Sequence, residues 1–469
     1  MQWYEFLTPH QVEQIHETSI KILDQIGIEF RYPPALEILS KGGARVEGER
    51  VYFSPQLVET QIKNAPAQFT LHARNPEKDV VIGGDNIAFV PGYGAPFVTD
   101  LEKGRREGTL LDFQNFVKLT GASPYQDVCS GMVIEPTDVP ADRRHAEMIY
   151  TALKYADKPI MGSAMGEKGA RDSIRMASIM FGTEKELAEK PRLIGLLCSL
   201  TPLSYDDRML GAIMEYAKAG QPQLISSLAI AGATSPATLA GTLALQNAEV
   251  LAGIVLTQLV RAGTPVIFAG SSTNAEMRTG ALCIGSPEMA LNTAATAQMA
   301  RYYNLPSRSG GAVSDSKSPD AQAAYESMMS LLMAQVSGIN FVLHTAGIFE
   351  SYNCMSYEKF IIDDEMCGMV KRIKKAYAVN EDTLGLAVTK ETGPGGHFLD
   401  KDHTMKHFRS EFFMPALSDR DGYDGWKERG SPTSMQTANR KYQEIIAAYE
   451  APELPEDADR ELKKFIETL

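Results

Sequence analysis

Residues 339–360 read INFVLHTAGIFESYNCMSYEKF, and this stretch indicates how the chain folds. Its first residues form the continuous apolar run that is typical of a strand buried on both faces, as in a parallel sheet. The run ends at His344, and after a short turn of small residues come Phe349, Glu350 and Tyr352. Polar and aromatic side chains directly after a core strand suggest a site at the carboxyl end of that strand.

Seven similar runs precede this one and give the chain a repeating strand–helix pattern. Each run is short, apolar and followed by a segment of helical periodicity, such as SPATLAGTLALQNAEVLAGIVLTQLVRAG. Eight strands that alternate with long helices predict an α/β fold of the (β/α)8 TIM barrel type. A doubly wound open sheet is the alternative, but no GxGxxG follows the first strand. The eight runs begin near Ala88, Val128, Lys158, Arg192, Gln221, Thr264, Leu305 and Ile339.

The segments outside the repeat predict two additions to a barrel of residues 88–380. Residues 1–87 predict an N-terminal extension, with a capped helix in TPHQVEQIHETSIKILDQIGIEF that Gly27 ends and a hairpin in RVEGERVYFS. Residues 381–469 predict a charged helical C-terminal tail. We expect this tail to pack on the barrel or on a neighbouring subunit, and we also expect a homo-oligomer.

Composition narrows the kinds of partner. The 469 residues carry a net charge of −13, and such a surface repels nucleic acid and anionic membranes. The N-terminus has no signal-peptide pattern, and five dispersed cysteines without a CxxC predict reduced thiols and a cytoplasmic protein. The longest apolar stretch, residues 239–260, does not predict a membrane span because it is interrupted by polar side chains. These are Gln246, Asn247, Glu249 and Gln258.

In a TIM barrel the active site lies at the C-terminal ends of the strands. Here those ends are rich in hydroxyls and aromatic rings, and only Glu135, Arg308, His344 and Glu350 could carry a charge. No P-loop and no GxSxG elbow accompanies them, so neither a phosphate site nor a serine hydrolase is predicted. The hydroxyl and amide side chains are Ser163, Ser199, Thr201, Ser226, Ser227, Ser271, Ser272 and Asn274.

The segment GPGGHFLDKDHTMKHFRSEFF contains the histidines that could bind a metal. His403 and His407 are four residues apart, which places both on one face of a helix, and His397 and Asp402 lie nearby. Neither a thiolate ligand nor an HExxH spacing accompanies them. The sequence therefore predicts no bound metal.

Three longer motifs resemble the trimethylamine methyltransferase family of corrinoid-dependent enzymes. They are GSSTNAEMRTGALCIGSPEMALNTAATAQMARYYNLPSRSGG, MSYEKF and GPGGHFLDKDHTMKHFRSEFF, and the similarity extends over nearly the whole chain. The resemblance implies a barrel that moves a methyl group from an amine to Co(I) of a separate corrinoid protein, in anaerobic one-carbon metabolism. The archetype of the family carries pyrrolysine, whereas this chain has only the twenty standard residues. The resemblance to the members without pyrrolysine implies that the substrate is a quaternary amine such as glycine betaine, proline betaine, carnitine or γ-butyrobetaine.

A quaternary ammonium ion donates no hydrogen bonds and is held by aromatic faces, worth about 0.5–2 kcal/mol each, and by carboxylates. We therefore expect a cage for the ammonium group, formed by the rings of Tyr93, Phe97, Phe349 and Tyr352 with Glu350. We also expect a cation for the substrate carboxylate, with Arg308 or His344 in that role. No catalytic residue is identified, and Glu350 is the strongest single candidate. The alternatives are a demethylase of a tertiary methylamine and a non-catalytic betaine-binding protein. The predicted substrate-binding residues are Tyr93, Phe97, Glu135, Arg308, His344, Phe349, Glu350 and Tyr352.

Overall fold

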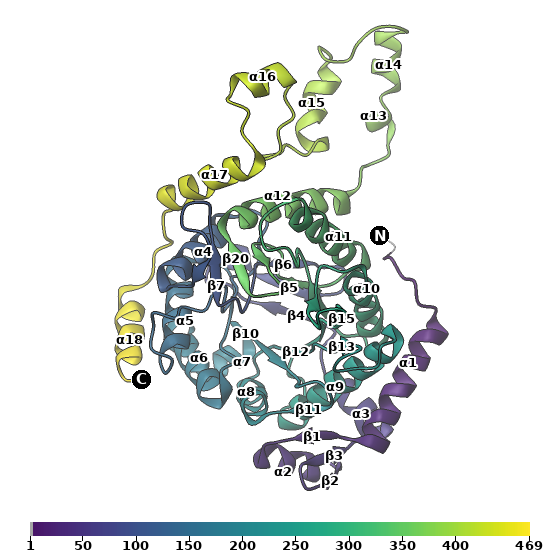
Figure 1. Ribbon diagram of the computed structural model, residues 1–469, viewed down its shortest axis with the longest axis vertical. Helices are drawn as coiled ribbons and strands as arrows, with labels where there is room; N and C mark the ends of the chain where they lie inside the picture. Colours follow the sequence, from purple (N-terminus) through teal and green to yellow (C-terminus); the bar gives the residue numbers. More distant parts are fainter. Residues whose placement is uncertain (1–2) are drawn as a thin grey trace.

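A computed structural model describes residues 3–469 and shows a ring of helices around a central barrel (Figure 1). Seven parallel strands form one curled sheet in the order β6–β18–β17–β14–β12–β10–β9. Each begins within two residues of a predicted position. The strands are β6 (Ala88–Val90), β9 (Ile160–Met161), β10 (Leu193–Cys198), β12 (Gln223–Ser227), β14 (Val266–Gly270), β17 (Ser307–Gly310) and β18 (Phe341–Leu343).

The segment 127–129 takes the eighth position and closes the sheet. The amide of Asp127 donates to the carbonyl oxygen of Phe89 in β6 at 2.7 Å, and the amide of Cys129 donates to the carbonyl of Pro159 at 2.8 Å. Cys129 also forms a parallel bridge with Ile160 in β9. The (β/α)8 barrel prediction is therefore confirmed, with one strand reduced to a few residues.

A helix follows every one of these eight strands and covers the outside of the barrel (Figure 1). The most deeply buried is α9, which is also the one helix of residues 3–469 long and apolar enough to match a membrane span; most of it is buried against the protein. The eight helices are α4 (Leu110–Ala122), α5 (Arg144–Tyr155), α6 (Gly166–Phe181), α8 (Asp207–Lys218), α9 (Leu239–Val260), α10 (Pro287–Tyr302), α11 (Ala321–Ser337) and α12 (Tyr357–Lys375).

The N-terminal residues supply a capped helix and two hairpins. α1 (Pro9–Lys21) begins with a capping box between Thr8 and Gln11. The hairpin of β2 (Arg45–Glu47) and β3 (Arg50–Tyr52) joins β1 (Ile28–Phe30) and β11 (Ser204–Tyr205) in a small sheet. A second hairpin, β4 (Gln68–Leu71) and β5 (Val80–Gly83), inserts Leu71 and Ile82 into the apolar core of the barrel. This hairpin closes the N-terminal end of the barrel, so access is from the C-terminal end.

Two small sheets are built by the loops at the C-terminal end. One is formed by β7 (Phe97–Thr99), β8 (Arg106–Glu107), β19 (Ile348–Phe349) and β20 (Cys354–Ser356). The other consists of β13 (Ile230–Ala231), β15 (Thr273–Ala275) and β16 (Leu282–Cys283). These sheets give the loops that follow the strands a fixed shape.

The C-terminal residues form a projecting lobe and two helices that return to the barrel (Figure 1). The helices of the lobe contain no buried residue. After it, α17 (Ser434–Ala448) packs on α12 and α4, and α18 (Glu456–Glu467) packs on α5 and α6. The division into segments 1–87, 88–380 and 381–469 stays a prediction, as does the homo-oligomer. The helices of the lobe are α13 (Glu381–Leu384), α14 (Leu386–Thr392), α15 (Asp402–Glu411) and α16 (Tyr423–Glu428).

Candidate functional site

The interior of the barrel is apolar at its base and polar towards its C-terminal end. Residues that pair across parallel strands face the same side of the sheet. Ala269 and Phe341 belong to the apolar barrel core, and Arg308 pairs with both. Ser226 pairs with Ala269, and Cys198 pairs with Ser226. Arg308, Ser226 and Cys198 therefore also face the interior.

Arg308 is a buried cation without an acidic partner among residues 3–469, since no ion pair with a carboxylate is formed. It is 2% exposed; its Nη1 donates to Ser271 Oγ, its Nη2 donates to His344 Nδ1 at 3.4 Å, and its Nε has no hydrogen-bond partner. Burial lowers the pKa of Arg308, yet a guanidinium stays protonated in proteins. An uncompensated buried charge costs several kcal/mol, so this arrangement suits a bound anion.

His344 is neutral and connects Arg308 to the loop after β6. Burial, Arg308 and Lys359 lower the pKa of His344 well below its usual value. A guanidinium only donates, so Nδ1 of His344 accepts from Arg308, and Nε2 carries the hydrogen towards the carbonyl oxygen of Tyr93 at 3.3 Å. Both ring nitrogens therefore form hydrogen bonds within the protein. His344 orients Arg308 and does not itself provide a positive charge for the substrate carboxylate.

Tyr352 supplies a second unpaired polar group beside Arg308. Its ring centroid lies 4.7 Å from that of His344, and its buried hydroxyl has no hydrogen-bond partner in the described part of the chain. Burial raises the pKa of Tyr352 to about 12, so the hydroxyl is protonated at neutral pH and can donate. Arg308 Nε and the Tyr352 hydroxyl together are two donors without acceptors.

The loop that carries these groups has an uncommon backbone. His344, Glu350, Ser351 and Tyr352 all have positive φ, between 51° and 73°. Such conformations cost about 1–3 kcal/mol each for non-glycine residues and persist where the surroundings hold them, frequently at functional sites. Here the Glu350 amide donates to the carbonyl of Ser316 at 3.0 Å, and Ser351 Oγ donates to Asp315 at 2.7 Å.

A buried ion pair ties this loop to the one that follows Arg308. Lys359 Nζ donates to Asp363 at 2.6 Å and to the carbonyl oxygen of Ala312 at 3.0 Å. The same Asp363 carboxylate accepts from the amide of Gly347 at 2.8 Å. Because Ala312 follows β17 and Gly347 follows β18, the pair holds the two loops of the Arg308 site together. The spacing of Lys359 and Asp363, four apart on one helix, was the sequence signal for this pair.

The predicted ammonium cage is only partly assembled. Glu350 is paired with Arg105, whose Nε lies 3.0 Å from the Glu350 carboxylate, and the guanidinium of Arg105 lies 3.7 Å from the ring centroid of Phe97. Phe349 is 1% exposed within β19. Of the four predicted rings, those of Tyr93 and Tyr352 lie near Arg308, which influences the pKa of both. Sequence reasoning did not include Arg105, because nothing in the sequence places it beside Glu350.

The remaining strand-end side chains bind other groups of the protein. Glu135 is paired with Arg144 at the edge of the barrel. Glu249 of α9 is fully buried and accepts hydrogen bonds from Ser227 at 2.7 Å, from Thr201 at 2.9 Å, and from Ser199. These hydroxyls therefore stabilise a buried carboxylate.

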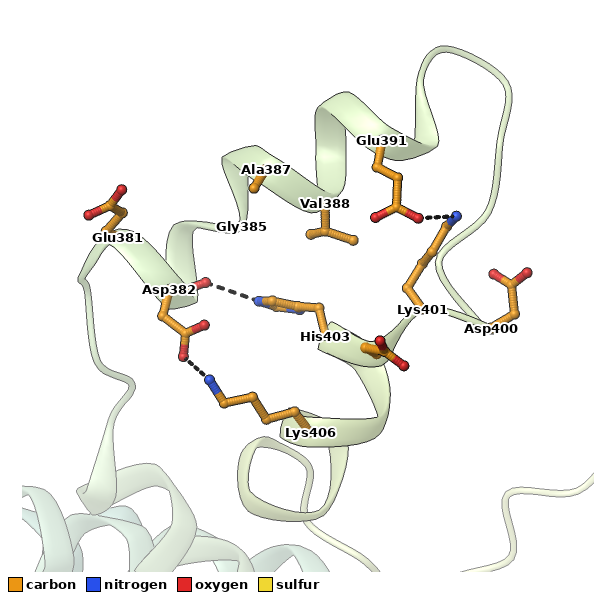
Figure 2. A pocket seen from close by; sticks show the side chains of 11 residues that line it. Glu381, Asp382, Gly385, Ala387, Val388, Glu391, Asp400, Lys401, His403 and Lys406 are labelled. Carbon is orange, nitrogen blue, oxygen red and sulfur yellow. Dashed lines mark hydrogen bonds and ion pairs between the residues drawn. The ribbon is translucent and has the colours of Figure 1, made fainter.

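His403 and His407 of the C-terminal lobe lie beside one acidic residue, Asp382, and Figure 2 shows His403 next to it. Asp382, His403 and His407 have ligand atoms within 4.8 Å of one another. However, Lys406 Nζ lies 2.7 Å from the Asp382 carboxylate, and His403 Nε2 lies 3.0 Å from the Asp382 carbonyl oxygen. The ammonium group of Lys406 thus occupies the position of a cation. The absence of a bound metal stays a prediction.

A shallow hollow of about 870 Å³ surrounds this cluster and is also lined by Asp402 and by the ion pair of Lys401 with Glu391 (Figure 2). His397 lies apart, paired with Asp400 on the surface. The hollow belongs to the projecting lobe and not to the barrel. The buried donors without partners, Arg308 Nε and the Tyr352 hydroxyl, lie in the barrel interior. The barrel site is therefore the stronger candidate.

Comparisons with known proteins identify the family of the chain. The trimethylamine methyltransferase family model matches residues 1–468. A glycine betaine methyltransferase from Desulfitobacterium hafniense is 53% identical over 463 residues, which is 99% of this chain and 96% of the relative. A proline betaine:corrinoid methyltransferase from Eubacterium limosum is 30% identical, over 98% of this chain and 97% of the relative.

A trimethylamine methyltransferase from Desulfitobacterium hafniense is 33% identical, over 97% of this chain and 91% of the relative. Among solved structures, the monomethylamine methyltransferase of Methanosarcina barkeri aligns with a TM-score of 0.53 at 10% identity, over 95% of this chain and 93% of that chain. At this identity the structural likeness supports the fold alone.

Proposed function

Because the chain belongs to the trimethylamine methyltransferase family, we propose that this methyltransferase removes a methyl group from a carboxylate-bearing quaternary amine and transfers it to a corrinoid protein. Glycine betaine is the substrate that fits best, since a 53% identical relative is named for it. The corrinoid group belongs to the separate partner protein and supplies the nucleophile, Co(I).

The observation that carries this proposal is the buried, acid-free guanidinium of Arg308. A betaine carboxylate would accept from Arg308 Nε and from the Tyr352 hydroxyl, two donors of this site that have no partner among residues 3–469. Hydrogen bonds to charged groups contribute about 1.5–3 kcal/mol each. The alternative substrate, a tertiary methylamine, has no carboxylate and would leave Arg308 unpaired, so the site favours the betaine.

For methyl transfer from a quaternary nitrogen, the protein has to orient the substrate and to exclude water. In the transfer, the electron pair of the C–N bond stays with nitrogen, and a neutral tertiary amine leaves. That leaving group needs no proton, which agrees with a site that has neutral His344 and Tyr352 and no acid in contact with Arg308. Anchoring the carboxylate at depth in the barrel directs the ammonium methyl groups towards the open C-terminal end, where a partner protein can approach.

A methyl-transfer assay with free cob(I)alamin tests the proposal. The purified protein is incubated with glycine betaine, proline betaine or carnitine, and methylcobalamin is followed by its absorbance. Trimethylamine and tetramethylammonium, which lack a carboxylate, are the matched controls. Methylcobalamin formed from a betaine and not from the controls supports the proposal. Transfer from trimethylamine alone would favour the tertiary-amine alternative, and tight betaine binding without transfer would favour a binding protein.

A further inference from the structure

The cationic end of the substrate needs a site that the predicted cage does not offer. Arg105 lies against both the Phe97 ring and the Glu350 carboxylate, so a second cation there would be repelled. Phe349 is covered within its strand. Of the predicted cage, Tyr93 remains beside an open space.

That space is an apolar cavity of about 160 Å³ at the C-terminal end of the barrel, between the loops after the second, third and fourth strands. Its walls come from segments that the sequence does not place together: the loops after β6, after segment 127–129 and after β9, together with α5, β10 and the start of α8. The methionine pocket, as we name it, is lined chiefly by Tyr93, Cys198, Met132, Met148, Met165 and Met209.

The methionine pocket adjoins the Arg308 site. Tyr93 and Cys198 line the pocket, and the charge of Arg308 acts on the pKa of both groups, against the effect of their burial. Cys198 also faces the barrel interior through its pairing with Ser226. A small molecule bound to Arg308 can therefore extend past Tyr93 and Cys198 into the pocket.

We propose that the methionine pocket holds the quaternary ammonium group of the substrate while Arg308 holds its carboxylate. The inference rests on the proposed function and assigns the subsite that the predicted cage leaves open. The size agrees, since an apolar protein cavity of about 150 Å³ admits a six-carbon ring such as benzene. A trimethylammonium group is no bulkier than such a ring.

The chemistry of the pocket walls also suits this group. A quaternary nitrogen is covered by methyl groups and makes no hydrogen bonds, so it binds to polarizable and aromatic surfaces, which methionine sulfur and the Tyr93 ring provide. The single ionisable base among the lining residues is His145, and its Nε2 lies 2.8 Å from the Asp172 carboxylate. Among the described residues that line the pocket there is no arginine or lysine, in contrast to the surroundings of Phe97.

One end of the pocket is buried and the other is exposed to solvent. Met148 is 4% exposed, whereas Met165, at the start of α6, is 56% exposed. A methyl group that points towards Met165 is thus accessible from solvent at the end of the barrel. This is the position in which a corrinoid partner can reach it.

Introducing a positive charge into the pocket tests the inference. Met209 and Met132 are both half-buried, so a lysine at either position can keep its ammonium group hydrated at the pocket edge. We expect Met209→Lys and Met132→Lys to raise the KM for glycine betaine at least tenfold. Met277→Lys, at an exposed position outside the pocket, is the matched control and keeps KM within about twofold. Met209→Gln alters the pocket wall without adding charge, so it should raise KM less than Met209→Lys does.

The isostere 3,3-dimethylbutyrate separates the effect of the added charge from damage to the fold. It has the carboxylate and shape of glycine betaine but no cationic nitrogen. As a competitive inhibitor it should bind the lysine variants as well as it binds the wild-type protein, because nothing in it repels the new charge. A betaine KM unchanged in both lysine variants, or equal losses for betaine and isostere, would overturn the inference. Failure of the proposed function is distinct, since the wild-type protein would then form no methylcobalamin from betaines.

Discussion

Arg308→Met removes a buried charge and keeps a side chain of similar length, and it should have two effects of opposite sign. Substrate binding should weaken, because the carboxylate loses its cation. The unliganded protein should be at least as stable as the wild type, because Arg308 is 2% exposed and pairs with no acid within residues 3–469. A residue that stabilises the fold would show the reverse combination.

The magnitudes follow from the contacts of Arg308. Removing one partner of a buried, hydrogen-bonded charge pair costs about 2–5 kcal/mol of binding, and 1.4 kcal/mol is tenfold, so KM should rise about 30- to 4,000-fold. In the free protein the variant loses two hydrogen bonds from a charged donor, to Ser271 and His344, worth about 1.5–3 kcal/mol each. Relief of the cost of burying the charge offsets this loss, and the net effect of replacing buried ions by apolar side chains is often neutral or stabilising by about 1–4 kcal/mol.

Two assays measure the two effects. Methylcobalamin formation gives KM and kcat for glycine betaine, and thermal unfolding with and without ligand gives stability. Ligand at 100 times Kd should stabilise the wild-type protein by about 2.7 kcal/mol and leave the variant unchanged. Arg278→Met is the matched control, because it removes the same charge from an exposed arginine on the loop between β15 and β16.

One combination of results would refute the reasoning. If Arg308→Met keeps the wild-type KM and melts well below the wild-type protein, Arg308 stabilises the fold and the carboxylate binds elsewhere. A similar rise in KM for Arg278→Met would show that the effect comes from net charge and not from the site.

Tyr352→Phe keeps the ring and removes the hydroxyl, so KM for glycine betaine should rise about tenfold or more with little change in kcat; an unchanged KM in both Tyr352→Phe and Tyr352→Ala would remove Tyr352 from the site. His344→Gln should reduce the loss of unfolding free energy that occurs as the pH falls below 6.5. Unfolded histidine takes up a proton below pH 6.5 and folded His344 does not, because its pKa is lowered. The wild-type protein should therefore lose up to about 1.4 kcal/mol of unfolding free energy per pH unit more than the variant between pH 6.5 and 5, and parallel profiles would contradict a neutral His344. Elemental analysis should find no stoichiometric zinc and chelators should leave activity intact; zinc lost together with activity would assign Asp382, His403 and His407 as ligands.

The barrel was predictable from the sequence because its signals are local. A buried strand and the helix that follows it each leave a pattern within about 20 residues, and the pattern recurs eight times. The strand at 128 was predicted as readily as the others, although it forms only a bridge and a few hydrogen bonds. Family resemblance came from long motifs that are likewise contiguous in the sequence.

The partners of the site residues were decided by the tertiary structure. Arg308 was predicted as a carboxylate ligand from its type and its place in a strand, but only the fold shows that its guanidinium is buried without an acid. Glu350 has the right type for an ammonium ligand, yet its carboxylate pairs with Arg105, 245 residues away in the chain. The methionine pocket joins separate segments from Tyr93 to Met209 and has no contiguous motif. Burial and charge pairing depend on groups that come together only in the folded chain. Residue type therefore indicates which side chains can bind a carboxylate or an ammonium group, and the tertiary structure decides which of them are available to do so.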